Sequence, residues 1–180
     1  MIKSLTGITL ALAGLSILAA GGAKADTYQV GMTYGTFSPS KSNVRENFGK
    51  SWSRFSIGRV DTTKPLKWQP SLDIATFYDD GPGTARLYAI TWGYERALVP
   101  DKSVQPYSAI RVGPYYGDIT AAGGNPSGNG FGLNANAALG VAFNQQFFIE
   151  ARYDFFSRMA GFNFDGLTLS AGVKLFDISL

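Results

Sequence analysis

The sequence predicts an all-β protein, a closed, eight-stranded antiparallel up-and-down transmembrane β-barrel. Three observations support this prediction. After residue 25 the chain contains eight runs of about ten residues in which apolar and polar residues alternate, separated by clusters of turn-forming residues. No segment there shows a convincing 3.6-residue apolar period. Charged residues make up only 16% of the chain and aromatic residues reach 14%, so much of the surface is expected to face something other than water.

The first 25 residues have the order of a secretory signal. Lys3 supplies a basic start, an apolar run extends over residues 5–20, and Ala23-Lys24-Ala25 forms a small-residue cleavage site. We therefore expect residues 1–25 to be a signal peptide and residues 26–180 to form a single barrel domain. Without Lys3 and Lys24 the basic residues nearly balance the 13 acidic ones, so no nucleic-acid partner is expected. The chain has no cysteine, which excludes disulfides.

The eight runs differ in how regularly they alternate. The first three are the least regular, whereas the seventh separates an apolar face from an ionic face that carries Glu150, Arg152 and Asp154. Because successive side chains of a strand point to opposite faces, such a run can present one face to lipid and the other to a barrel interior. The runs cover residues 27–36, 51–60, 69–78, 84–97, 104–117, 131–143, 146–157 and 164–176.

The five later runs each have a clear apolar face, which we expect to face outward. The opposite face of these runs holds mainly glycine, alanine, serine and asparagine with scattered charges, and small residues suit the crowded interior of an eight-stranded barrel. The apolar faces consist of Tyr88, Ile90, Trp92 and Tyr94 in the fourth run, Ile110 and Val112 in the fifth, Leu133, Ala135, Ala137, Leu139 and Val141 in the sixth, Phe147, Ile149, Ala151, Tyr153 and Phe155 in the seventh, and Leu167, Leu169, Ala171, Val173 and Leu175 in the eighth.

The connections and the aromatic residues fit a membrane barrel. The two long connections, 37–50 and 118–130, are the first and the fifth, and odd-numbered connections are external when both chain ends are periplasmic. Aromatic residues near the strand ends are expected to form two girdles at the membrane interfaces. One girdle contains Tyr28, Trp68, Tyr94, Phe143 and Phe147, and the other contains Phe55, Tyr78, Tyr88, Tyr116 and Phe155.

Three segments resemble the small outer-membrane barrels of the OmpA/OmpX type. They are Gly-Tyr-Glu-Arg at 93–96, Ile-Glu-Ala-Arg-Tyr-Asp-Phe at 149–155, and the run from Gly166 to Phe176. The resemblance covers the chain after residue 25 and implies export to the outer membrane of a Gram-negative-type bacterium. The partners that it implies are membrane lipid, lipopolysaccharide and the outer-membrane assembly machinery. Such barrels usually end on an aromatic residue, whereas four residues follow Phe176 here, which leaves open how assembly reads this end.

The polar faces predict a charged interior. Four basic and four acidic residues fall on them, and charges removed from water persist only when they are paired and hydrogen-bonded. We therefore expect an ion-pair network that fills the lumen. Its members are Arg54, Arg111, Arg152, Lys174, Asp73, Glu95, Glu150 and Asp154.

The residue types argue against catalysis. Histidine is absent, which removes the usual general base and the commonest neutral metal ligand, and the enzymes known among such barrels rely on histidine. We expect no catalytic residues, no cofactor and no metal. Loop 37–50 contains Lys41, Arg45 and Lys50, so this loop, and the glycine-rich loop 118–130, are candidates for contact with a surface ligand.

Three functions remain open from the sequence. The first is a non-enzymatic outer-membrane barrel with a structural or surface-interaction role, whose lumen is blocked by ion pairs. The second is a narrow channel for small or hydrophobic solutes, because glycine and alanine on the interior face leave room for a passage. The third is a soluble periplasmic barrel that would hold its aromatic side chains inside, around an apolar ligand.

Overall fold

The computed structural model describes residues 27–59, 68–79, 81–99, 103–144 and 146–179. The expected signal peptide and most of the second connection lie outside these residues, and so does the side chain of Tyr28. Within the described chain, no helix is both long and apolar enough to cross a membrane.

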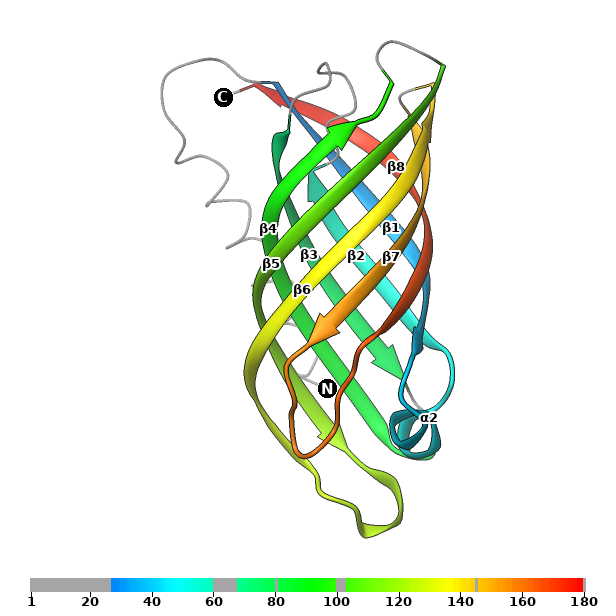
Figure 1. Cartoon of the computed structure of the whole chain (residues 1–180), viewed down its shortest axis with the longest axis vertical. Helices are drawn as coiled ribbons and strands as arrows, with labels where there is room; N and C mark the ends of the chain where they lie inside the picture. Colours follow the sequence, from blue (N-terminus) through cyan, green and yellow to red (C-terminus); the bar gives the residue numbers. More distant parts are fainter. Residues whose placement is uncertain (1–26, 60–67, 80, 100–102, 145, 180) are drawn as a thin grey trace, which may run out of the picture.

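The described chain forms a closed antiparallel barrel of eight strands, as the sequence predicts (Figure 1). Each strand pairs with its neighbours in sequence, and β1 closes the sheet against β8. The strands are β1 (Thr27–Pro39), β2 (Trp52–Arg59), β3 (Gln69–Asp79), β4 (Thr84–Ala97), β5 (Val104–Thr120), β6 (Gly128–Phe143), β7 (Phe147–Phe156) and β8 (Gly166–Ser179).

The register tilts the strands strongly. A row of directly paired residues can be followed once around the closed sheet. A row that starts at Arg86 of β4 and passes through β3, β2, β1 and the other strands returns to β4 at Arg96 instead of Arg86. A closed sheet with such a stagger must have inclined strands, which is visible in Figure 1. The carboxyl end of β8 and the carboxyl end of β4 lie at the same end of the barrel. We call this the closing end, and the opposite end, where α2 lies, the loop end.

The two long connections differ from the sequence-based expectation. Connection 37–50 is not a simple loop, because β1 continues to Pro39 and the helix α2 (Ser42–Phe48) follows it. Connection 118–130 is mostly an extended hairpin, because β5 continues to Thr120 and β6 begins at Gly128. A short 3₁₀ helix, η1 (Ala122–Gly124), makes the turn between them. The hairpin projects beyond the other strands at the loop end (Figure 1).

Side chains alternate between the two faces of the wall as the period-two pattern predicts. Ile110 and Val112 are half exposed on the outside, while Arg111 between them is buried inside. In β7, Ile149 and Phe155 point outward, and Glu150, Arg152 and Asp154 are buried. The outer wall is therefore apolar and the inner wall of the central barrel is polar.

Gly140 on β6 lets Tyr107 on β5 lie flat against the inner wall. A Cβ atom at position 140 would overlap the Tyr107 ring, and the tyrosine hydroxyl donates to Glu150 Oε2 at 3.1 Å. Replacing Gly140 by alanine is expected to reduce the free energy of unfolding by about 1–3 kcal/mol, because the crowded ring must move. Urea unfolding in phospholipid vesicles measures this loss. The double variant with Tyr107→Ala removes the clash and is expected to lose little more than Tyr107→Ala alone; a full additional loss would contradict the explanation.

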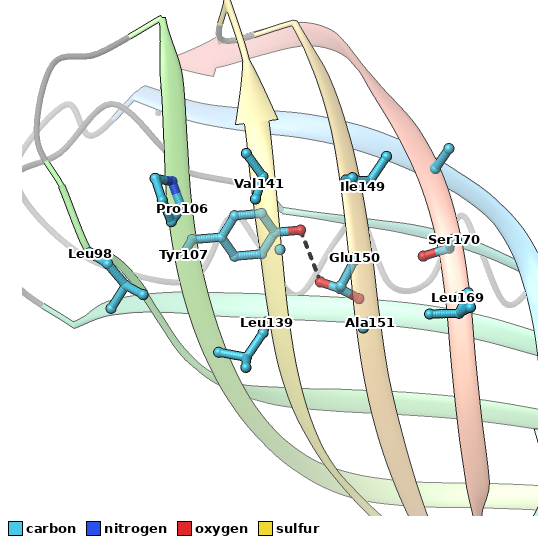
Figure 2. Close-up of a pocket in the computed structure, with 12 residues that line it drawn as sticks. Leu98, Pro106, Tyr107, Leu139, Val141, Ile149, Glu150, Ala151, Leu169 and Ser170 are labelled. Atoms are coloured by element: carbon cyan, nitrogen blue, oxygen red, sulfur yellow. Dashed lines mark hydrogen bonds between the residues drawn. The ribbon is translucent and has the colours of Figure 1, made fainter.

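The outer wall of β5–β8 carries an apolar groove of about 660 Å³ (Figure 2). Small residues such as Ala151 and Ala171 lie between larger ones such as Leu139 and Ile149, so the surface is hollowed there. The groove extends past Pro106 to Leu98, which follows β4 at the closing end.

Candidate functional site: the filled lumen

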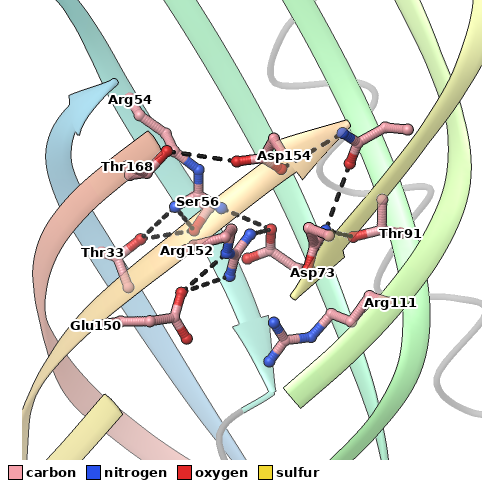
Figure 3. A network of polar contacts seen from close by, with 12 residues as sticks. Thr33, Arg54, Ser56, Asp73, Thr91, Arg111, Glu150, Arg152, Asp154 and Thr168 are labelled. Atoms are coloured by element: carbon pink, nitrogen blue, oxygen red, sulfur yellow. Dashed lines mark hydrogen bonds and ion pairs between the residues drawn. The ribbon is translucent and has the colours of Figure 1, made fainter. Parts of the chain in front are cut away.

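Three strands contribute a layer of ion pairs across the middle of the lumen (Figure 3). Asp73 of β3 accepts hydrogen bonds from two guanidinium groups, Arg54 of β2 at 2.7 Å and Arg152 of β7 at 2.5 Å. Arg152 also binds Glu150, two residues earlier on the same strand, at 2.8 Å. Arg54 is completely buried, so its charge depends on these partners.

Neutral groups complete the environment of Arg54. Its Nη1 donates to Thr33 Oγ1 at 3.2 Å and to Ser56 Oγ at 3.1 Å, and these two hydroxyls share a hydrogen bond of 2.6 Å. Such charge-assisted hydrogen bonds are stronger than neutral ones. The arginine therefore links β1, β2 and β3 through one side chain.

A second ion pair lies beside the first layer. Arg111 of β5 donates through Nη2 to Glu95 of β4 at 2.9 Å and through Nε to Ser71 of β3 at 3.0 Å. All three side chains are buried. Together the two groups of ion pairs connect β2, β3, β4, β5 and β7.

Two residues of the expected network lie apart from these ion pairs. Asp154 is buried, and its hydrogen-bond donors among the described residues are neutral: Asn134 Nδ2 and Thr168 Oγ1, each at 3.4 Å. Lys174 was expected in the same network, but its Nζ donates to Gln29 Oε1 at 2.6 Å near the closing end. The central lumen thus holds three arginines and four carboxylates, and Lys174 lies nearer the closing end, where it binds Gln29.

The loop end of the lumen holds a different filling, an aromatic cluster that we call the plug. Its buried side chains come from β1, β2, β3, β4, β5, β7, helix α2 and the connection after β7. They include Phe37, Val44, Phe48, Trp52, Phe77, Tyr115, Phe156, Met159, Phe162 and Phe164.

Many ring pairs in the plug are packed edge to face, and the others are tilted. The Phe37 ring lies 5.4 Å from Trp52 and 5.1 Å from Phe77, and Phe48 of α2 lies 5.0 Å from Phe162. These centroid distances are in the favourable range for aromatic pairs. Arg54 lies 5.4 Å from the centroid of the Phe77 ring, so the plug and the ion-pair layer are in contact.

The local sequence explains how α2 enters the plug. Val44 and Phe48 are four residues apart, which places both on one side of a helix, and both are fully buried. Arg45 fixes the start of the helix by donating to the carbonyl oxygens of Pro39 at 3.0 Å and Ser40 at 2.8 Å. The sequence predicted an external loop at 37–50 and did not indicate that part of it packs inside the barrel. The signal was a pair of apolar residues in a polar segment.

The aromatic residues expected at the membrane interfaces lie on the outer wall where their side chains are described. Tyr88 and Tyr116 are partly buried and the others are exposed. The exposed residues are Trp68, Tyr94, Phe143 and Phe147 of the first expected girdle and Phe55, Tyr78 and Phe155 of the second. Sequence reasoning missed Tyr34 and Phe131, which are also exposed.

Among the described residues, no group of three or more histidine, cysteine, aspartate or glutamate side chains could hold a metal ion. In the lumen, ion pairs connect strands across the barrel and packed aromatic rings fill the loop end. The interior side chains therefore contact one another.

Solved structures share this fold, although their sequences are only distantly similar. Neisserial surface protein A matches with a TM-score of 0.57 and 16% identity, covering 86% of this chain and 99% of that one. The attachment invasion locus protein Ail of Yersinia pestis matches with a TM-score of 0.55 and 16% identity, over 84% of this chain and 100% of Ail. The outer membrane enzyme PagL matches with a TM-score of 0.53 and 14% identity, over 81% and 99%. No protein-family model and no curated protein matches the sequence.

Proposed function

We propose that this chain, which has the fold of the small eight-stranded outer-membrane β-barrels, is a closed, non-enzymatic surface barrel. In this proposal residues 1–25 direct export, the assembly machinery inserts residues 26–180 into the outer membrane, and the loop end faces outward. The observation that carries the proposal is the double filling of the lumen. The ion-pair layer crosses the middle of the barrel, and the plug occupies the loop end.

The outer wall supports the membrane setting. A soluble periplasmic barrel would expose polar residues and hold its aromatic residues around a ligand. Here Leu139, Ile110 and Leu169 are more than half exposed on the outer wall, and the interior is occupied by its own side chains. An apolar outer band of this kind is what lipid contact requires.

A gel and a fractionation test the membrane setting. The protein in purified outer membranes is expected to migrate faster without heating than after boiling in detergent, because a lipid-stabilised barrel stays compact. Recovery in the soluble periplasmic fraction without detergent, together with the absence of a shifted band, would overturn the proposal.

Planar-bilayer recordings test whether the barrel is closed. The wild-type protein is expected to give no reproducible single-channel steps, because Arg54, Arg152 and Asp73 cross the lumen and the plug fills the loop end. An open porin inserted from the same detergent is the control for insertion and detection. Reproducible steps from the wild-type barrel would instead favour the narrow channel.

The basic residues at the loop end suggest a surface role. Lys41, Lys50 and Arg158 are exposed there, and exposed cations attract anionic surface molecules such as lipopolysaccharide. One structure of Ail holds the heparin analogue sucrose octasulfate, which is also anionic. Binding to immobilised lipopolysaccharide is expected to weaken in Lys41→Gln/Lys50→Gln and to fall with added salt. Unchanged binding in the double variant would argue against a role for these lysines.

A further inference from the structure

We infer that the outer groove is a binding site for one phospholipid, with its phosphate on Arg96 and an acyl chain in the apolar part of the groove. This inference rests on the proposed membrane setting and adds a specific ligand to it. It uses residues on the outer wall, separate from the lumen described above.

The groove follows two neighbouring rows of outward residues. In one row, Leu139 of β6 is paired with Ala151 of β7, which is paired with Leu169 of β8. The adjacent row contains Val141, Ile149 and Ala171. All six line the groove, and the alanines leave a hollow between the larger side chains. A hollow of this shape can hold a flexible hydrocarbon chain.

Arg96 lies at the closing-end side of the first row. It is paired with Ser108 of β5, and Ser108 is paired with Leu139, so the row continues from the arginine into the groove. On β4, Arg96 also lies two residues before Leu98, which lines the groove. Since outward positions recur every second residue, Arg96 and Leu98 lie on the same outer face, next to each other along the chain direction.

The state of Arg96 indicates an anionic ligand. Its Nε is buried without a hydrogen-bond partner, and no ion pair of this arginine is present in the described part of the chain. An arginine binds a phosphate through two parallel hydrogen bonds. The apolar groove beside it selects a phosphate that carries a hydrocarbon chain over a free phosphate ion.

The position along the barrel selects the lipid. Arg96 is one residue before the carboxyl end of β4, and that end of the strand lies at the closing end. The closing end is periplasmic when both chain ends are periplasmic. From there the row of paired residues runs obliquely along the outer wall, away from the closing end, because the strands are inclined. A phospholipid of the periplasmic leaflet would have its headgroup at Arg96 and its chain along Leu139 and Ala151. Lipid A of the outer leaflet would place its phosphates at the opposite end.

Native mass spectrometry of the folded barrel tests this site. The protein is released from mixed micelles that contain both phosphatidylglycerol and lipid A, and the fraction that retains one molecule of each lipid is measured. Arg96→Gln is expected to reduce retention about tenfold, as the loss of charged hydrogen bonds implies. Ala151→Leu, which fills the groove, is expected to reduce it similarly while leaving the arginine in place.

Matched variants separate this site from general lipid coverage. Arg86→Gln removes an arginine from the other end of the same strand, and Ala137→Leu enlarges an exposed outward alanine that does not line the groove. Both are expected to retain lipid at the wild-type level. Equal retention in all four variants, or retention of lipid A in preference to phosphatidylglycerol, would overturn the inference. The gel shift of each variant is measured in parallel, so that failure of the membrane barrel itself is recognised separately.

Discussion

Asp73→Asn is expected to reduce the free energy of unfolding by about 3–5 kcal/mol, the cost of removing one partner of a buried ion pair. Asp73 is the carboxylate that both Arg54 and Arg152 bind. Arg152 would keep Glu150, but Arg54 would lose its charged partner and keep neutral ones such as the hydroxyls of Thr33 and Ser56. Urea unfolding of the barrel in phospholipid vesicles, followed by the gel shift, gives the loss.

A matched control and a rescue make this prediction sharper. Asp118 of β5 is exposed, so Asp118→Asn is expected to change the free energy of unfolding by less than about 0.5 kcal/mol. The double variant Asp73→Asn/Arg54→Met removes the unpaired charge and is expected to recover part of the loss, since an apolar replacement of a buried ion pair is often tolerated. A double variant that is less stable than Asp73→Asn alone would show that the unpaired charge is not the cause.

The local alternation of the sequence was sufficient for the fold and for much of the interior. Whether a side chain faces lipid or lumen depends on the parity of its position in a strand, which a single run reveals. This is why Glu150, Arg152 and Asp154 could be assigned to the interior from the seventh run alone. The closed barrel then followed from the number and length of the runs.

The partners inside the lumen could not be predicted in the same way. Asp73 and Arg152 lie 79 residues apart, and they meet because of the stagger between strands, which no single run contains. The partner of Lys174 is also distant in the sequence, because Gln29 lies on β1, 145 residues away along the chain. The register between β1 and β8 shifts between Val30 and Gly31, opposite residues 174–176, so simple alternation is interrupted there.

The plug was missed because its residues resemble others on the outer wall. Phe155 and Phe156 are adjacent, yet Phe155 faces outward and Phe156 packs against Phe77 and Tyr115 inside. Composition alone does not distinguish the two roles. Helix α2 has seven residues, which is too short for a periodic pattern to be recognised.

Trp52→Ala is expected to reduce the free energy of unfolding by about 3–5 kcal/mol, the usual cost of truncating a large buried aromatic residue. Trp52 is 1% exposed and its ring contacts Phe37, Phe48 and Phe164. Its Nε1 also donates to the carbonyl of Gly49 at 3.1 Å, which holds the end of α2. The loss should therefore combine a cavity in the plug with a weaker anchor for the helix.

Trp92→Ala is the control for Trp52→Ala. Trp92 lies on the outer wall and is 55% exposed, so its truncation leaves no internal cavity and is expected to cost clearly less. Limited proteolysis adds a second measurement, because the release of α2 should make the segment around Lys41 and Lys50 more sensitive to trypsin in Trp52→Ala than in Trp92→Ala. If both variants lose equal stability and trypsin cuts them equally, the plug does not hold the loop end closed. If only Trp52→Ala loses stability and becomes sensitive to trypsin, the packing of the plug keeps α2 in place and the loop end closed.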